Sequence, residues 1–274
     1  IVYKQGGFSL NGNVLTVNTI KKRFKFSYSR PYEGRVKRIA IKRSRLGEYY
    51  LIITTDAEPK AYGKTHDGAS VGIDFGLKTY MTLSDGTTVR NPLFLKSDLD
   101  NVRRKSRSLS KCKKGSNNRQ RRRKDVCREF ENITHKREDF QWKLAHELCR
   151  KYDYIFIEDL SLHGMTRMWG LKMSDLAHAE FVGKLECVTR KYSVTVHKID
   201  RFYPSSKTCE CGYVNRELKL SDREWVCPEC GKVNDRDLNA AENILRKGIS
   251  ELWSGSKTVS DTASRACTQK SHAL

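Results

Sequence analysis

The sequence predicts an α/β fold interrupted by a metal-binding module, and three features of the chain support this prediction. Residues 70–89, SVGIDFGLKTYMTLSDGTTV, alternate between apolar and polar positions around turn signals and indicate three successive strands. The apolar run Tyr152–Leu160 is typical of a central strand that is covered on both faces. Four cysteines lie in two close pairs between residues 207 and 234, a spacing that suits one metal ion.

The composition points to an anionic partner. The chain of 274 residues has a formal net charge of +21, and nucleic acid is the first candidate to neutralise it. An acidic membrane surface is second, but no apolar run reaches the length of a spanning helix and no stretch has the pattern of a signal peptide. Cysteines scattered along the chain indicate a reducing compartment, so we expect a cytoplasmic protein.

Residues 1–58 are expected to form part of a β-barrel domain. Strands are predicted at VLTV, FKFSYS, VKRIAIKR and YYLIITT, with a hairpin turn at Asn11-Gly12. Basic residues occupy the polar phase, which fits either a solvated face or a wall that grips a phosphate backbone. Because the chain starts with Ile in what reads as the middle of a β region, we expect an N-terminal portion to precede it.

Asp74 interrupts the apolar phase of the first strand after this region. A carboxylate inside a buried strand is costly unless it is paired or bound to a metal. Gly72 and Gly76 keep the backbone around it open, and metal ligation is favoured over a structural hydrogen bond. An acid on the first strand of a three-strand meander is how the RNase H-like fold begins.

Residues 97–151 are expected to be helical, with a break at residues 113–117. Half of the residues between Arg103 and Arg128 are Lys or Arg, so pairs four residues apart cannot relieve the repulsion. Phosphate binding explains this better than a solvated face, although such contacts position a nucleic acid without reading its sequence. The predicted contacts are Arg103, Arg104, Lys113, Lys114, Arg121, Arg122 and Arg123.

The strand Tyr152–Leu160 ends in two acids, Glu158 and Asp159. By alternation only one of them can face Asp74, and the other is expected to cap or hydrogen-bond the following loop. A helix over residues 174–192 and a strand over 193–200 follow, and His197 on that strand is interpreted as a structural residue or a phosphate neighbour. Polar residues then lead into the cysteine module and are further candidates for nucleic-acid contact: Arg201, Ser205, Ser206 and Lys207.

Cys209, Cys211, Cys227 and Cys230 are predicted to bind one structural Zn²⁺ ion, because four thiolates complete a tetrahedral site. Glycine follows each pair and frees the backbone to turn. Asp237 then lies at the start of a helix expected to stop at Gly248. Its carboxylate could ligate a second, harder metal or simply favour the helix N-terminus. The tail over residues 249–274 lacks periodicity, and we expect disorder there.

The order of elements is therefore an RNase H-like layout over residues 69–206, a zinc ribbon over 207–234 and a last helix over 235–248. Three carboxylates from separate elements would converge in it: Asp74, the acid at the end of the second apolar strand, and Asp237. Their mutual repulsion would be relieved by two Mg²⁺ (or Mn²⁺) ions, for which oxygen ligands are suited. Such a centre hydrolyses phosphodiester bonds.

The motifs VGIDFGLK, PSSKTC, LSDREWVCPECG and NDRDLNAAENIL resemble the TnpB (OrfB) family of insertion-sequence proteins, often labelled transposases, from about Phe8 to Leu245. These are RuvC-like nucleases related to type V CRISPR effectors. The resemblance implies Asp74, Glu158 and Asp237 as catalytic acids, and an endonuclease that cuts target DNA under a guide RNA. It also implies that residues 1–58 are the remaining part of the family's wedge-like barrel domain, which contacts guide RNA and target duplex. The spacing Cys209-x-Cys211 departs from the family's usual Cys-x-x-Cys.

Two other functions remain open at this point. One is a catalytically inactive zinc-ribbon protein that binds nucleic acid and acts as a guided repressor, against which the presence of all three acids argues. The other is a transposase accessory factor that works without guide RNA.

Overall fold

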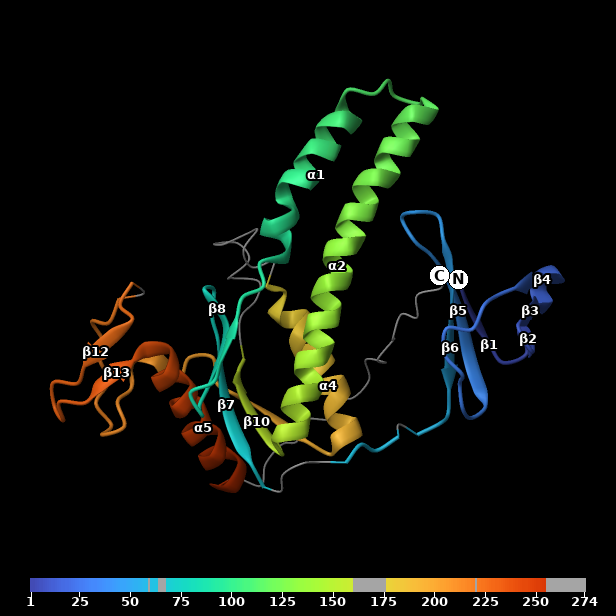
Figure 1. Cartoon of the computed structure of the whole chain (residues 1–274). Helices are drawn as coiled ribbons and strands as arrows, with labels where there is room; N and C mark the ends of the chain where they lie inside the picture. Colours follow the sequence, from blue (N-terminus) through green and yellow to red (C-terminus); the bar gives the residue numbers. More distant parts are fainter. Residues whose placement is uncertain (59, 64–67, 160–175, 220, 255–274) are drawn as a thin grey trace. The chain divides into compact units, whose positions relative to one another are not determined.

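The computed structural model describes residues 1–58, 60–63, 68–159, 176–219 and 221–254 (Figure 1). Over this part of the chain two compact units are distinguished. One comprises residues 1–60 and 100–132, and the other comprises residues 61–99 and 133–254. Within the described ranges, no helix combines the length and the apolar character that crossing a membrane requires.

The N-terminal strands form two antiparallel three-stranded sheets with a common core. One sheet has the order β1 (Val2–Lys4), β5 (Val36–Arg43), β6 (Tyr49–Thr55), and the other has the order β2 (Phe8–Asn11), β3 (Val14–Val17), β4 (Lys22–Lys25). Leu15, Val17 and Ile39 are buried between them. These sheets are the counterpart of the expected barrel part, and no strand pairing closes them into one barrel within residues 1–58.

One predicted strand of this region was misplaced. The segment FKFSYS was expected to be a strand, but β4 covers Lys22–Lys25 and ends before Phe26. The register explains the difference, because Lys25 pairs with Val14, the first residue of β3. Beyond that pair the N–H of Phe26 donates to the carbonyl of Asn13, in the hairpin turn before β3, at 2.9 Å, and β4 extends no further.

The second unit contains a mixed five-stranded sheet. Its order is β11 (Thr195–Ile199), β10 (Tyr154–Glu158), β7 (Ser70–Phe75), β8 (Thr79–Leu83), β9 (Thr88–Arg90). The strands β7, β8 and β9 form the predicted antiparallel meander, whereas β10 runs parallel to both β7 and β11. The carboxyl ends of β7 and β10 therefore lie at the same edge of the sheet.

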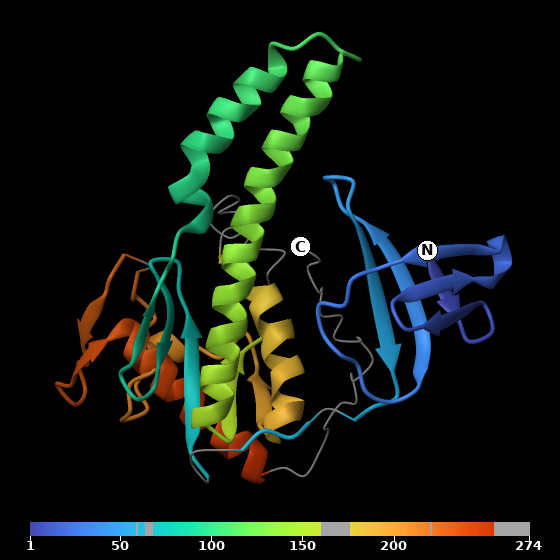
Figure 2. The ribbon, with the colours of Figure 1, turned by 45° about the vertical axis from the view of Figure 1, so that its right-hand side comes forward.

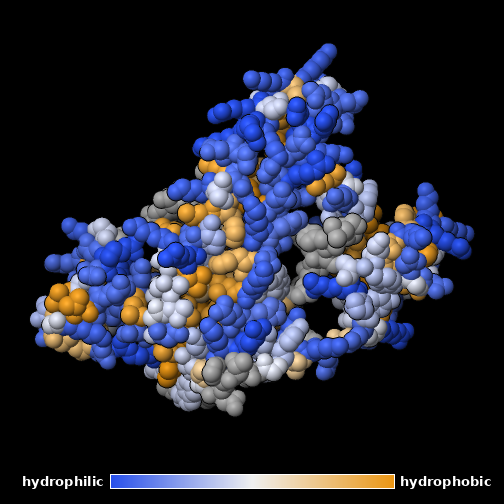
Figure 3. Space-filling model, viewed as in Figure 1, coloured by the Kyte–Doolittle hydropathy of each residue, from blue (hydrophilic) through white to orange (hydrophobic). Residues whose placement is uncertain are grey.

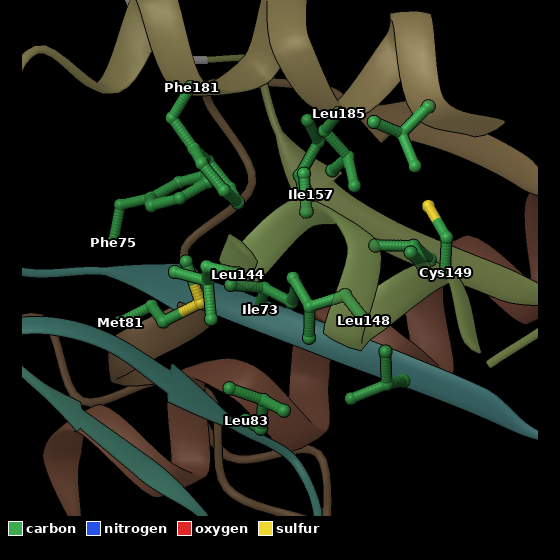
Figure 4. Close-up of a cluster of buried hydrophobic side chains, with 14 of the residues drawn as sticks. Ile73, Phe75, Met81, Leu83, Leu144, Leu148, Cys149, Ile157, Phe181 and Leu185 are labelled. Carbon is green, nitrogen blue, oxygen red and sulfur yellow. The ribbon is translucent and has the colours of Figure 1, made fainter. Parts of the chain in front are cut away.

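Helices cover both faces of this sheet. The helices α2 (Asn117–Lys151) and α4 (His178–Tyr192) lie on one face, and α5 (Arg236–Ser254) lies on the other (Figure 2). The main core forms on the first face, where Ile73, Leu148 and Leu185 come together from β7, α2 and α4 (Figure 4). The predicted break in the basic segment is present, since α1 (Phe94–Ser110) and α2 are separate helices.

Two glycines let α5 lie directly on the opposite face of the sheet. A Cβ atom on Gly72 would be 2.1 Å from the carbonyl oxygen of Ala241, and one on Gly248 would be 2.1 Å from Cδ1 of Phe156. The prediction that this helix stops at Gly248 was wrong, because α5 continues to Ser254. The glycine there serves close packing rather than a helix end, and residues 255–274 of the expected tail lie outside the described part of the chain.

A small ribbon precedes α5. Its strands β12 (Glu224–Val226) and β13 (Val233–Asp235) are antiparallel, and a short 3-10 turn, η2 (Ser205–Lys207), leads into it from β11. Trp225 and Leu218 pack with Cys209 and Cys227 to form its core. Since β13 continues directly into α5, the ribbon sets the position at which that helix begins.

Candidate metal centres

Asp74 and Glu158 lie beside each other on parallel strands and face α5. Ile73 of β7 pairs with Ile157 of β10, so the next residue of each strand is one of the two acids. Gly72 faces α5, and residues two apart on a strand share a face, so Asp74 faces α5 as well. Phe156 likewise contacts α5, which places Glu158 on the same side. The alternation argument thus puts Glu158, and not Asp159, beside Asp74.

Asp237 is in the first turn of α5, which begins at this edge of the sheet. The side chain of Asp235 accepts a hydrogen bond from the backbone N–H of Leu238 at 2.8 Å and so caps the helix. Asp237 is therefore not needed as the cap. Its negative charge acts on Asp74 instead, as the pKa of Asp74 shows.

The pKa of the Asp74 carboxyl is raised to about 7, first by burial and then by the charges of Asp237 and Glu158. The pKa of Glu158 is also raised to about 7, first by burial and then by its neighbour Asp159. Such shifts indicate anionic groups crowded in a poorly solvated place, which a divalent cation would stabilise. The donors are all oxygen atoms, which fit Mg²⁺ or Mn²⁺.

Arg223 lies against Asp237 and was not identified from the sequence. Its Nη1 donates hydrogen bonds to the two carboxylate oxygens of Asp237, at 3.0 and 3.3 Å. The backbone holds it there, because the N–H of Arg236 donates to the carbonyl of Arg223 at 2.7 Å. No sequence pattern distinguishes Arg223 from the many other arginines, and only the folded ribbon brings it to the acids.

Asp159 faces away from the three acids. Its carboxylate forms an ion pair with Arg201 in the turn after β11, and its backbone N–H donates to the carbonyl of Ile199 at 3.1 Å. The prediction was that Asp159 caps or hydrogen-bonds the loop after its own strand; that loop begins at residue 160 and lies outside the described residues, and the partners seen here come from β11 and the turn after it. Arg201 is therefore engaged in an ion pair beside the acids.

The four ribbon cysteines form a compact cluster. Their Sγ atoms all lie within 4.8 Å of one another, with 3.6 Å between Cys209 and Cys230 and also between Cys211 and Cys227. Zn–S bonds of about 2.3 Å in a tetrahedron place sulfurs about 3.8 Å apart, so the cluster fits one Zn²⁺ ion. The Cys-x-Cys spacing closes the site, helped by positive φ at Gly212 (+98°) and Gly231 (+72°).

The predicted phosphate contacts differ in whether their side chains are exposed, paired with another residue or buried. The hairpin of α1 and α2 is hydrophilic over most of the surface in view (Figure 3), and Lys113, Lys114, Arg121 and Arg123 are exposed there without an acidic partner among the described residues. Other candidates are engaged: Arg103 with Asp100 at 3.5 Å, Arg104 with Asn101 at 3.1 Å, Arg122 with Asp125 at 3.7 Å, and Lys207 with the carbonyl of Arg216 at 3.4 Å. Ser206 is half-buried, and Ser205 is buried against α5, which favours a structural role for it.

His197, interpreted from the sequence as structural or as a phosphate neighbour, pairs through Nε2 with Glu251 of α5 at 2.8 Å. The contact ties β11 to the C-terminal half of α5. This favours the structural interpretation.

Two family models match the chain. One, described as "Probable transposase" of the OrfB and IS605 type, matches residues 53–168, and the other, described as a Cas12f1-like TNB domain, matches residues 178–244. A "Putative RNA-guided DNA endonuclease" of Streptomyces pristinaespiralis is 35% identical over 253 residues, which are 90% of this chain and 62% of that protein. InsQ of Escherichia coli K12, which has the same description, is 27% identical over 84% of this chain and 61% of its own length.

A solved structure also resembles the chain. It is a cryo-EM structure of a Cas12f1–sgRNA–target DNA complex, with a TM-score of 0.53 and 21% identity over 77% of this chain and 45% of that one. The fold is therefore similar to that of Cas12f1. The chain spans less than two thirds of the length of each of the relatives named here. The resemblance seen in the sequence motifs is confirmed by these matches.

Proposed function

We propose that this chain, which belongs to the TnpB (OrfB) family, is an RNA-guided, metal-dependent DNA endonuclease encoded by an insertion sequence. The observation that supports this best is the arrangement of Asp74, Glu158 and Asp237, from three separate elements, around one edge of the sheet. The printed names of the relatives support the guide RNA and the DNA substrate.

The sheet supports an RNase H-like (RuvC) assignment for the second unit. A meander of β7, β8 and β9 is followed by two strands parallel to β7, and the first strand carries an acid. The acids sit where β7 and β10 end, which is the edge at which α/β sheets commonly bind their ligands.

In this proposal Asp74, Glu158 and Asp237 hold two Mg²⁺ (or Mn²⁺) ions. Such ions activate a water molecule and stabilise the leaving 3′ oxygen during an in-line displacement at phosphorus. Burial raises the pKa values of Asp74 and Glu158, and bound cations would favour the ionised form of these two carboxyl groups. Arg223 donates to Asp237 and keeps a cationic group beside the place where the phosphodiester would lie.

The four cysteines hold one structural Zn²⁺ ion, since four protein ligands leave no open position. Their role is structural. The ribbon they stabilise carries Arg223 and leads into α5, so it fixes both the arginine and Asp237.

The exposed basic residues of the hairpin, among them Lys113, Lys114 and Arg121, would bind the phosphates of the guide RNA or target DNA. These contacts are independent of sequence, so base pairing with the guide would choose the target.

The test is DNA cleavage in Mg²⁺ by the protein with its copurifying RNA, before and after RNase treatment. We expect cutting that disappears with the RNA and is abolished by Asp74→Ala. The surface variant Asp100→Ala, which removes an exposed acid of α1, should leave cutting unchanged. Cutting that survives RNase would indicate an unguided nuclease. RNA binding without cutting would favour the guided repressor, and purification free of RNA would favour the accessory factor.

A further inference from the structure

Phe202 is the most exposed large apolar side chain among the described residues, with 86% of its surface accessible. It follows β11, whose last residue, Ile199, pairs with Glu158. A single exposed apolar residue needs no explanation by itself, because most protein surfaces carry some. The turn that presents this ring is what makes it informative.

The turn is held by hydrogen bonds inside it. The side chain of Asp200 accepts from the backbone N–H of Phe202 at 2.9 Å, and the carbonyl of Asp200 accepts from Tyr203 at 3.1 Å. The neighbouring aromatic ring points inward, where Tyr203 packs near Ile199 and lies 5.8 Å from the ammonium group of Lys247. The same turn therefore partly buries Tyr203 and leaves Phe202 exposed.

Both ends of the turn are fixed to the elements that carry the acids. At one end Arg201 forms its ion pair with Asp159, the neighbour of Glu158. At the other end the buried side chain of Asn243, on α5, donates to the carbonyls of Ser205 at 2.8 Å and Thr208 at 2.6 Å. Phe202 therefore lies in a turn that is held at both ends, between the strand that carries Glu158 and the helix that carries Asp237.

An exposed aromatic face in a braced turn suits a nucleobase. Bases stack on aromatic rings without regard to sequence, because every base has a π face. The chain carries a formal net charge of +21, which favours an anionic polymer over a protein as the partner of this turn. A base can reach such a ring only if it is not paired within a duplex.

We propose that Phe202 is a stacking platform for an unpaired base of the DNA strand that enters the candidate metal centre. This inference rests on the proposed function and deepens it, because it names a residue that would position the DNA strand at the site. Phe202 positions the strand, and the carboxylates act on its phosphodiester.

The test measures binding separately from cutting. A fluorescein-labelled oligothymidylate is titrated with the protein in Ca²⁺, at a salt concentration high enough to weaken phosphate contacts. Phe202→Ala should raise the Kd about 5- to 100-fold, since base stacking on an aromatic ring has an effect of that size. Phe202→Trp should bind like the wild type. Phe202→Leu should bind like the alanine variant, because it keeps an apolar surface but lacks a ring.

Two controls make the result specific. Trp253→Ala removes an exposed aromatic ring at the far end of α5 and should leave the Kd unchanged. An oligonucleotide of the same length with abasic sites should bind the wild type and Phe202→Ala equally, because it has no base to stack.

Equal affinity of the wild type and Phe202→Ala for oligothymidylate would overturn the proposal. So would a loss of self-association in Phe202→Ala, which would assign the ring to contact between two copies of the chain. Failure of the proposed function has a different outcome: DNA cutting that persists in Asp74→Ala while the binding difference at Phe202 remains.

Discussion

Replacing Asp74 with Asn should stabilise the metal-free protein while abolishing cutting. The pKa of Asp74 is raised to about 7 in the folded protein from an ordinary value of 3.8. The folded state therefore holds a proton that the unfolded chain releases. The stability due to this proton is complete below the unfolded pKa and is lost as the pH rises through the folded one. Asparagine never ionises, so the free energy of unfolding of the variant does not fall with rising pH for this reason.

The size of the effect follows from the shift. At about pH 5 ionisation of Asp74 favours the unfolded state by about 2 kcal/mol, and at about pH 8 by about 4 kcal/mol. The free energy of unfolding of Asp74→Asn should thus exceed that of the wild type by a margin that grows by about 2–3 kcal/mol between these pH values.

The assay is urea denaturation followed by circular dichroism, without divalent ions, at both pH values. Asp100→Asn is the matched control, since 96% of the Asp100 side chain is exposed. Adding Mg²⁺ should stabilise the wild type more than the variant, because the cation binds only the folded carboxylates. A difference between wild type and variant that stays the same at both pH values would refute the electrostatic reasoning.

Three further predictions concern the elements around this site. Cys227→Ser should lower the zinc content, measured by atomic absorption, and make the ribbon sensitive to protease; unchanged zinc stoichiometry would reject the four-cysteine site. Gly72→Ala should destabilise the protein by roughly 2–4 kcal/mol in urea, because its Cβ would meet Ala241, whereas Gly183→Ala has open space and should not destabilise it. Arg223→Ala should tighten Mg²⁺ binding in calorimetry severalfold by removing a competing cation yet reduce cutting, and weaker Mg²⁺ binding would contradict that role.

Local patterns pointed to Asp74 and to the thiols, whereas the choice of Glu158 and Asp237 as catalytic acids rested on the family resemblance. Asp74 was found because a charge interrupts an apolar strand, and the cysteines because their spacing suits one ion. The break between α1 and α2 was visible as a polar, glycine-containing segment. These signals lie within a few residues of one another, where strand alternation and turn chemistry act directly.

The sequence by itself therefore singled out the candidate acids and thiols, while the tertiary structure decided how they are arranged. Gly248 reads as a helix end, yet it lies inside α5, where Phe156, far away in the chain, occupies the space that a side chain would need. Arg223 reaches Asp237 only after the ribbon folds, and Phe202 is exposed while the neighbouring Tyr203 packs near Ile199. Each of these outcomes depends on contacts between distant segments, which no local pattern contains, because packing is settled only when the sheet and α5 close on each other.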